Sequence, residues 1–382
     1  MFSKMPFVLI AVVLAVVFLD PFISLTLKQT LYALSLTIKE IIVALLPFII
    51  FGLLFKASVT LASGATRIIG LILVLVCISN FVSTFLSHSV GSWIYHFDLS
   101  MIKPKEFQGL QPLWTLTLPK LIPNAGAMFA GIILGILASI FCPQPAQKIA
   151  LKIDKWVGGL LKSFVYLIPF FVTGFVINLQ YDGVVATIAK DYTSIVGVIA
   201  LACFSYIFLV YFLLSSGKIK TFANCIKNML PAAISGFSTM SSAASMPLTI
   251  IGVENSVKNK DLSRSVVPAT VNIHLVGDCF AIPIFAYAVL KSFGMNEPSL
   301  LSYLTFSLYF VMAKFSVAAI PGGGILVMLP ILESHLGFNA EMMSMITALY
   351  VLFDPVITCA NVFGNGAFAK LIDNIAAKIG MK

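Results

Sequence analysis

Long apolar runs alternate with short polar segments along the 382-residue chain. Runs of about 18 or more apolar residues are typical of membrane-spanning helices. The pattern predicts an all-α polytopic membrane protein with eight transmembrane helices and two helical hairpins. The predicted spans are 6–25, 36–58, 66–97, 122–142, 157–180, 193–216, 266–291 and 341–380, and the predicted hairpins are 228–252 and 300–337.

Polar breaks interrupt both hairpins. Ser235–Pro247 carries six hydroxyl side chains, and Ala318–Gly324 contains a proline followed by three glycines. Irregular backbone inside a bilayer survives only where it is buried in protein or lines a wet cavity. Paired interruptions in corresponding halves of a chain indicate the midplane binding site of a secondary transporter. We therefore expect both hairpins to be re-entrant, because neither half is long enough to cross alone.

Composition supports a membrane protein. Hydrophobic residues make up 59% of the chain and charged residues only 10%, with a mean hydropathy of +1.03. Soluble domains carry about 25% charged residues. The net charge of +9 comes from short lysine clusters between apolar runs, which argues against a nucleic-acid partner.

The lysines and arginines also predict an orientation. They are more numerous in the segments that a cytoplasmic N-terminus would place inside. The positive-inside rule then predicts a multi-pass protein of the plasma (inner) membrane with both termini cytoplasmic and with hairpins that open from opposite sides. Residues 98–121 contain three prolines and are expected to form an external linker.

The last predicted span carries a polar face. Asp354, Thr358, Asn361 and Asn365 are separated by four, three and four residues, which places them on one side of a helix. An intramembrane aspartate normally faces the interior of the bundle, where it has a partner or a ligand. The alternative is a polar stripe that only holds helices together.

In the seventh span, Thr270, His274 and Asp278 follow at i, i+4 and i+8 and would share one face of a regular helix. Asn272 joins that face only if the backbone unwinds locally. His274 and Asp278 are expected to pair, either as a structural contact or as a proton-responsive pair, since an imidazole titrates near neutrality.

The hairpin tips offer backbone and hydroxyl donors. Gly322, Gly323 and Gly324 permit unusual φ angles and a close approach to a ligand, and Ser241 and Ser242 add hydroxyl groups. Helix starts beyond the tips direct N–H groups at whatever lies between them, which favours a carboxylate. Taken alone, the serines could be caps and the glycines a flexible loop.

Four segments in order resemble the dicarboxylate/amino acid:cation symporter family, which has the glutamate-transporter fold. They are Ser241-Ser-Ala-Ala-Ser-Met-Pro247, Pro268-Ala-Thr-Val-Asn272, Ala319-Ile-Pro-Gly-Gly-Gly-Ile-Leu-Val-Met-Leu-Pro330 and Asp354-Pro-Val-Ile-Thr-Cys-Ala-Asn-Val-Phe-Gly364. The resemblance is good over 228–370, and the order of the first six spans agrees with it.

The resemblance implies a homotrimer that works by elevator-type alternating access. It implies a scaffold of 1–65 (spans 1 and 2) and 122–180 (spans 4 and 5), with the linker 98–121. The moving transport part would be 66–97 (span 3) and 181–382 (span 6, hairpin 1, span 7, hairpin 2 and span 8).

The resemblance also implies site residues and a cation-coupled symport of a small amino acid or carboxylate. The substrate-binding residues would be Ser241, Ser242, Ile320, Pro321, Gly322, Gly323, Gly324, Asp354, Thr358 and Asn361. The coupling residues, for sodium or protons, would be Thr270, Asn272, His274, Asp278, Asn361 and Asn365, with Na+ ligands at Asn272 and Asn361.

Three departures from the family pattern change these expectations. Ile357 stands where the family has an arginine for a side-chain carboxylate, so a neutral amino acid is favoured over an acidic one. His274 and Asn365 stand where the family has cation-ligating aspartates, which weakens sodium sites. A register shift of two would make Asp278 the replacement acid, but the ungapped register is preferred.

Other functions are kept as alternatives. One is a dicarboxylate or glutamate symporter with altered, proton coupling; another is a degenerate member that is non-transporting or channel-like. A remote alternative is an intramembrane aspartyl protease, on Asp182 and Asp278, although Leu275 occupies a position where that signature needs glycine. Zinc-helix, nucleophile-elbow and phosphate-loop signatures are absent from the sequence, so neither an enzyme nor an organic cofactor is expected.

Overall fold

The computed structural model describes residues 5–63, 67–97, 110–119, 122, 124–181, 185–317 and 322–378. Most of these residues are helical, whereas 110–119 and the connections between helices are not. The helices are α1 (Met5–Leu19), α2 (Leu25–Ser63), α3 (Arg67–His96), α4 (Asn124–Phe141), α5 (Pro143–Tyr181), α6 (Val185–Leu214), α7 (Ile219–Thr239), α8 (Ser242–Glu254), α9 (Lys260–Thr270), α10 (Val276–Ser292), α11 (Leu300–Lys314), α12 (Gly323–Leu336) and α13 (Ala340–Lys378), with a short 3-10 turn at Asp20–Phe22.

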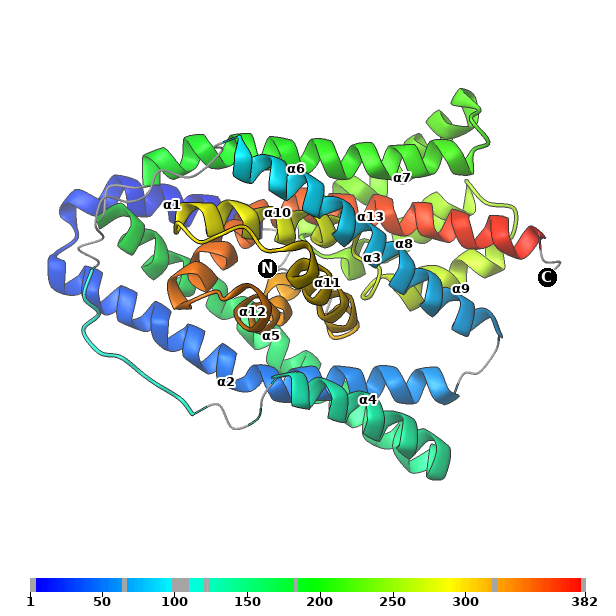
Figure 1. The fold of residues 1–382 in the computed structure, drawn as a ribbon, viewed down its shortest axis with the longest axis horizontal. Helices are drawn as coiled ribbons and strands as arrows, with labels where there is room; N and C mark the ends of the chain where they lie inside the picture. The colour runs from blue at the N-terminus through cyan, green and yellow to red at the C-terminus, as the bar shows by residue number, and fades with distance from the viewer. Residues whose placement is uncertain are drawn as a thin grey trace.

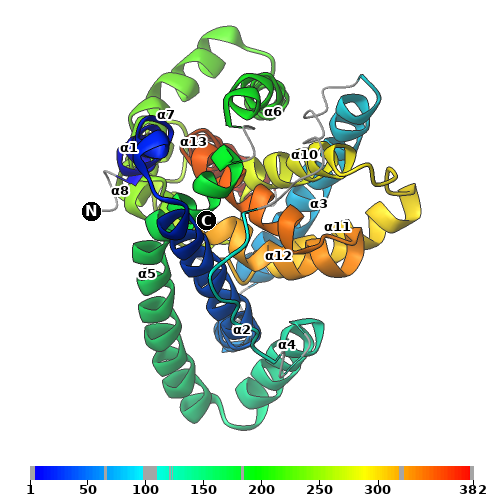
Figure 2. The same ribbon diagram turned by 90° about the vertical axis from the view of Figure 1, so that its left-hand side faces the viewer.

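The helices pack in two groups. α2, α4 and α5 lie together on one side of the molecule, with α1 against α5, whereas α3, α10, α11 and α12 lie on the other side (Figure 2). α6 and α13 run beside each other along the long axis (Figure 1). α13 also contacts α7, α8, α10 and α12, so this helix connects both hairpins to the core.

Apolar side chains cover the outside of the molecule and the polar ones gather inside. Phe18, Phe141 and Leu201 are at least 70% exposed, while every residue from His274 to Leu290 is buried. Such an outer surface is costly in water but matches lipid. Among the described residues, three helical stretches are long and apolar enough to cross a membrane, Gly70–His96, Ser194–Leu214 and Ala340–Lys378. The chain is a multi-pass membrane protein.

Within the described residues, every predicted span and hairpin contains helix, but several helices are longer than predicted. α2 begins at Leu25 instead of 36, α5 begins at Pro143 instead of 157, and the first hairpin begins at Ile219 instead of 228. The added residues are less apolar, so a hydropathy threshold misses them although they continue the helix. In the hairpin, for example, Cys225 is buried between the exposed Lys220 and Lys227.

A residue with left-handed backbone lies where each hairpin reverses direction. Met240 adopts a left-handed conformation at the end of α7, and Ser241 follows as the N-cap of α8. In the second hairpin, Gly322 has φ +70° at the start of α12, a conformation that strains any residue with a Cβ. The two-residue turn keeps α7 and α8 packed together, and α11 likewise packs against α12.

The seventh predicted span is broken rather than continuous. α9 ends at Thr270 and α10 starts at Val276, with non-helical backbone between them. Asn80 of α3 spans this gap, because its Nδ2 donates to the Ile273 carbonyl at 2.7 Å and its Oδ1 accepts from the Leu275 N–H at 3.3 Å. A buried side-chain amide thereby satisfies backbone groups that the helix no longer pairs.

We predict that Asn80→Leu destabilises the protein, because it leaves two buried backbone groups without partners. Each such group costs roughly 1–3 kcal/mol, so thermal unfolding in lipid nanodiscs is expected to occur several degrees lower. Ser83→Ala is the matched control, since the buried Ser83 hydroxyl bonds only to the Ser79 carbonyl of its own helix. Equal melting temperatures for Asn80→Leu and Ser83→Ala would show that the unwound segment does not depend on Asn80.

Candidate functional site

Two buried carboxylates meet the start of α12. Asp278 lies in the first turn of α10 and Asp354 lies in the middle of α13, and both are at most 2% exposed. Asp354 accepts the Gly322 N–H at 2.8 Å. Gly324 approaches Asp278 so closely that a Cβ at this position would overlap the carboxylate. The N-terminus of α12, with its partial positive charge, therefore faces both acids.

Asp354 has only neutral donors. Its Oδ2 accepts from the Gly322 backbone and its Oδ1 from the Thr358 hydroxyl at 2.7 Å. Among the described residues, no basic side chain forms an ion pair with this carboxylate. The last predicted span was expected to carry its polar face toward the interior of the bundle. The burial of these side chains is confirmed, and they lie on one continuous helix: Asp354, Thr358, Asn361 and Asn365.

Asp278 has an ionic partner. The Lys314 Nζ at the end of α11 lies 2.8 Å from its Oδ2, and Lys314 is completely buried. The other oxygen, Oδ1, accepts from the Tyr350 hydroxyl at 2.9 Å and from the Asn361 Nδ2 at 3.0 Å. One carboxylate thus connects α10, α11 and α13.

Asn361 completes this junction. Its Oδ1 accepts the Gly277 N–H at 2.8 Å and the Asp278 N–H at 3.4 Å. These are first-turn N–H groups of α10 that have no partner within their own helix. Asn361 therefore caps α10 with its oxygen and binds Asp278 with its nitrogen.

The tip of the first hairpin lies along the same helix. Gly236 of α7 packs against the Thr358 backbone of α13. Ser241 accepts the Ala244 N–H at 3.2 Å as the cap of α8, and Ser242 is buried beside it. Ser241 thus has the capping contact that was the alternative to a ligand role, and α8, the helix that it caps, packs against α13.

The polar face predicted for the seventh span is wrong. Thr270 ends α9, Asp278 belongs to α10, and His274 lies in the unwound residues between them, so the i, i+4 and i+8 positions no longer share one side. The predicted pairing of His274 with Asp278 is also wrong, because the Asp278 oxygens bind Lys314 and α13 side chains instead. Asn272 is exposed and lies in the unwound segment. Local unwinding was the condition under which Asn272 was expected to join the site.

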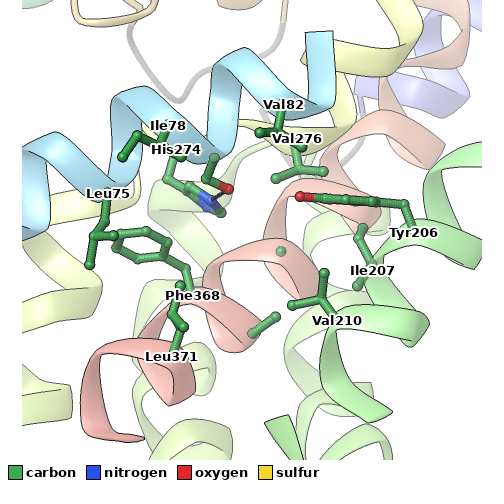
Figure 3. Close-up of a pocket in the computed structure, with 13 residues that line it drawn as sticks. Leu75, Ile78, Val82, Tyr206, Ile207, Val210, His274, Val276, Phe368 and Leu371 are labelled. Carbon is green, nitrogen blue, oxygen red and sulfur yellow. Dashed lines mark hydrogen bonds between the residues drawn. The ribbon is translucent and has the colours of Figure 1, made fainter. Parts of the chain in front are cut away.

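His274 points into a separate cavity. Its Nε2 lies 2.9 Å from the Ser79 hydroxyl, and its ring is tilted by 34° against the Phe368 ring with centroids 4.4 Å apart. The cavity, of about 220 Å³, lies between α3, α6 and α13 and is mainly apolar (Figure 3). Within the described residues, His274 Nδ1 and both polar atoms of the Asn365 side chain have no hydrogen-bond partner.

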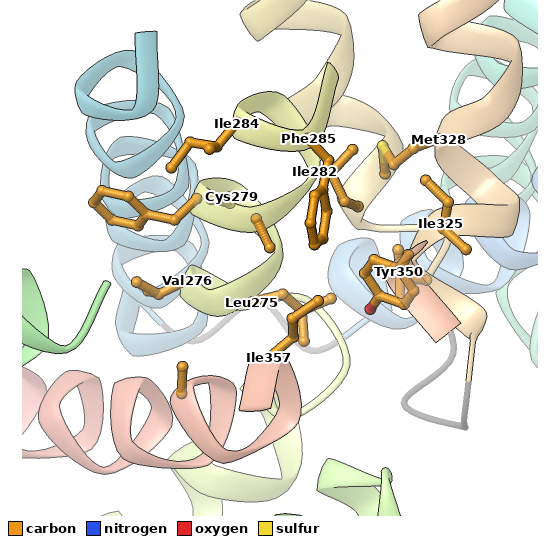
Figure 4. Close-up of a cluster of buried hydrophobic side chains, with 14 of the residues drawn as sticks. Leu275, Val276, Cys279, Ile282, Ile284, Phe285, Ile325, Met328, Tyr350 and Ile357 are labelled. Atoms are coloured by element: carbon orange, nitrogen blue, oxygen red, sulfur yellow. The ribbon is translucent and has the colours of Figure 1, made fainter. Parts of the chain in front are cut away.

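An apolar wall borders the two acids. Ile357 is 2% exposed and follows Asp354 by about one helical turn. Figure 4 shows Leu275, Ile357, Ile325 and Tyr350 around the junction of α10, α12 and α13. This turn of α13 carries no basic side chain.

Three residues that contribute to the site or position it were not predicted from the sequence. Lys314 had a signal, since it is the only lysine in the second hairpin and a charge in an apolar segment indicates a partner. Tyr350 and Asn80 had none, because the partner of each lies far away in sequence. Three further predicted positions, Ile320, Pro321 and Asp182, lie outside the described residues.

Comparisons with known proteins identify the family of the chain. Residues 5–375 match the sequence model of the Sodium:dicarboxylate symporter family. The chain is 26% identical over 214 residues to Excitatory amino acid transporter 1 of Mus musculus, a match that covers 55% of this chain and 38% of that protein.

Two further relatives are similar at the same level. Excitatory amino acid transporter 1 of Ambystoma tigrinum is 27% identical over 277 residues, or 67% of this chain and 50% of that protein. A putative sodium-dependent excitatory amino acid transporter of Caenorhabditis elegans is 24% identical over 231 residues, or 59% and 41%. The matched part spans half or less of these relatives. Because the family match extends over nearly the whole chain, the protein belongs to the sodium:dicarboxylate symporter family.

Proposed function

We propose that this protein is a cation-coupled secondary active transporter for a small amino acid or carboxylate, with a neutral amino acid preferred. Family membership supports the transport class. The observation that carries the proposal is the Asp354 carboxylate, which is buried beside the start of α12 and has only neutral partners among the residues that the structure describes.

A buried carboxylate without a counter-charge is unstable in an apolar interior. The Gly322 N–H and the Thr358 hydroxyl satisfy lone pairs of Asp354 but do not neutralise it. The α-ammonium of an amino acid supplies both the charge and the donors that this carboxylate lacks. Opening of the second hairpin would release the Gly322 contact and admit that group.

The surroundings of Asp354 favour a neutral side chain on the substrate. Ile357 presents an apolar surface, and the nearby ammonium of Lys314 is already bound to Asp278. A second substrate carboxylate would therefore have to lose its hydration without gaining a cation. That loss costs several kcal/mol, which disfavours aspartate and glutamate relative to alanine and serine.

The packing of the helices supports an elevator mechanism. We propose that α1, α2, α4 and α5 form a scaffold and that α3 with α6–α13 forms the moving part, since each group packs mainly within itself. The proposed topology has eight spans, two re-entrant hairpins and cytoplasmic termini. An exposed apolar groove of Phe55, Leu134 and Phe141, between α2 and α4, favours a scaffold interface in a homotrimer.

Coupling is part of the same proposal. The unwound segment with Asn272 and His274, next to Asn365 and the end of α9 at Thr270, is the proposed coupling region for sodium or protons. The name of the sodium:dicarboxylate symporter family supports sodium. His274 in place of a carboxylate supports a proton as the alternative coupling ion.

Uptake into proteoliposomes tests the function directly. Radiolabelled alanine, serine, aspartate and succinate are offered under an inward sodium gradient, an inward proton gradient or neither. We expect gradient-driven accumulation of alanine or serine above that of aspartate. Preferential succinate or aspartate uptake would favour a dicarboxylate symporter, and the absence of accumulation of any of them would contradict the transporter.

Asp354→Asn is predicted to remove substrate binding. Loss of one partner of a buried ion pair costs about 3–5 kcal/mol, or a hundredfold or more in Kd. The increase in melting temperature that saturating alanine or serine produces in the wild type should disappear. Asp373→Asn on the same helix is the matched control, because Asp373 accepts the Lys258 and Asn259 N–H groups and, within the described part of the chain, has no other hydrogen-bond partner. An unchanged ligand shift in Asp354→Asn would remove this residue from the site.

Ile357→Arg is predicted to change selectivity toward acidic substrates. The guanidinium would offer a bidentate partner to a substrate carboxylate, so the ratio of aspartate to alanine uptake should rise about tenfold or more. Ile357→Leu, which keeps the wall apolar, should leave the ratio unchanged. If the buried arginine prevents folding, competition decides the point: serine should inhibit wild-type alanine uptake at concentrations where aspartate does not. Equal inhibition by both would contradict the role of Ile357.

A further inference from the structure

The Lys314–Asp278 pair is not needed to explain how Asp354 binds an ammonium group. Lys314 is 0% exposed and its Nζ lies 2.8 Å from Asp278 Oδ2 and 4.5 Å from the centre of the Phe310 ring. An ammonium in such a place has left water completely and is stabilised by the carboxylate and the aromatic face.

The oxygens that a metal cation would need at this junction are already used. Asp278 Oδ1 accepts two hydrogen bonds, from Tyr350 and Asn361, and Oδ2 accepts the ammonium. The only oxygen of the Asn361 side chain accepts two backbone N–H groups of α10. Sodium binds oxygen ligands, so the donor set at Asp278 and Asn361 does not fit a sodium ion while Lys314 is in place.

The Lys314 ammonium makes the contacts that a bound metal cation would make at this junction. It neutralises Asp278, which starts α10, and it belongs to α11, the first half of the second hairpin. The second half closes on the same carboxylate, because Gly324 of α12 lies against Asp278 and Tyr350. Both halves of the hairpin are thus fastened to one charge on α10.

We propose that the Lys314 ammonium is a resident cation that occupies the place of an exchangeable sodium ion at the junction of α10, α11 and α13. The second hairpin is then held to Asp278 without a metal ion at this position. This inference rests on the proposed function only for its consequence in transport. The protein would carry one coupling ion fewer per cycle than a transporter that binds an exchangeable sodium ion at this junction.

Cation rescue of a lysine deletion tests the proposal without transport. Lys314→Ala leaves Asp278 without its counter-charge and leaves space for a small cation. Thermal unfolding of purified protein is followed in choline chloride and in equal concentrations of sodium chloride or methylammonium chloride. Choline is the reference because it provides the same ionic strength but is too large for the space.

We expect the melting temperature of Lys314→Ala to lie well below that of the wild type in choline and to rise by several degrees in sodium or methylammonium. The wild type should not show this additional rise. Lys370→Ala is the matched control, because the buried Lys370 ammonium donates to the Ser256 carbonyl, and it should respond to the salts as the wild type does. The double variant Lys314→Met with Asp278→Asn, which lacks both charges, should lose the cation response.

If Lys314→Ala cannot be isolated in choline, its folded yield in each salt serves as the same readout. Failure of every small cation to improve Lys314→Ala beyond its level in choline would overturn the proposal, as would an equal sodium response in Lys314→Ala and the wild type. These results are independent of uptake. A protein that accumulates no substrate would contradict the transport function and leave the cation rescue to be judged separately.

Discussion

The structure depends on how charges are accommodated inside an apolar bundle. Asp278, Asp354 and Lys314 are each at most 2% exposed in a chain with only 10% charged residues. Without water, a buried charge must find a counter-charge and hydrogen-bond donors. All three groups meet at the start of α12, where backbone N–H groups are not used by the helix. This requirement fixes the tip of the second hairpin against α10 and α13.

The two acids satisfy that requirement differently, and the difference separates their proposed roles. Asp278 is neutralised by a side chain of the same protein and holds helices together. Asp354 receives only dipoles, from the Gly322 backbone and the Thr358 hydroxyl. A carboxylate whose charge is uncompensated at a movable tip is suited to a cationic ligand, whereas a fully paired carboxylate is suited to structure. In the proposed function, Ile357 then limits which ligands are compatible with the site.

Much of this architecture follows from the sequence, because hydropathy and helical spacing are local properties. The regions of the spans, both hairpins and the buried polar face of α13 were all predictable in this way. The break at 271–275 changed the seventh span, since unwinding moves His274 away from Asp278 and depends on Asn80 from a distant helix. The pairing of Asp278 with Lys314, 36 residues away, likewise requires the three-dimensional arrangement. Helix ends in less apolar segments, as in α2 and α5, were missed because hydropathy marks lipid contact rather than helix length.

The most direct test of this account is an electron cryomicroscopy structure of the protein in lipid nanodiscs with saturating alanine. The account predicts ligand density between the two hairpin tips, with the ammonium group within hydrogen-bond distance of Asp354 and the methyl group toward Ile357. Density in the His274 cavity instead, with Asp354 still bound only to Gly322 and Thr358, would contradict it.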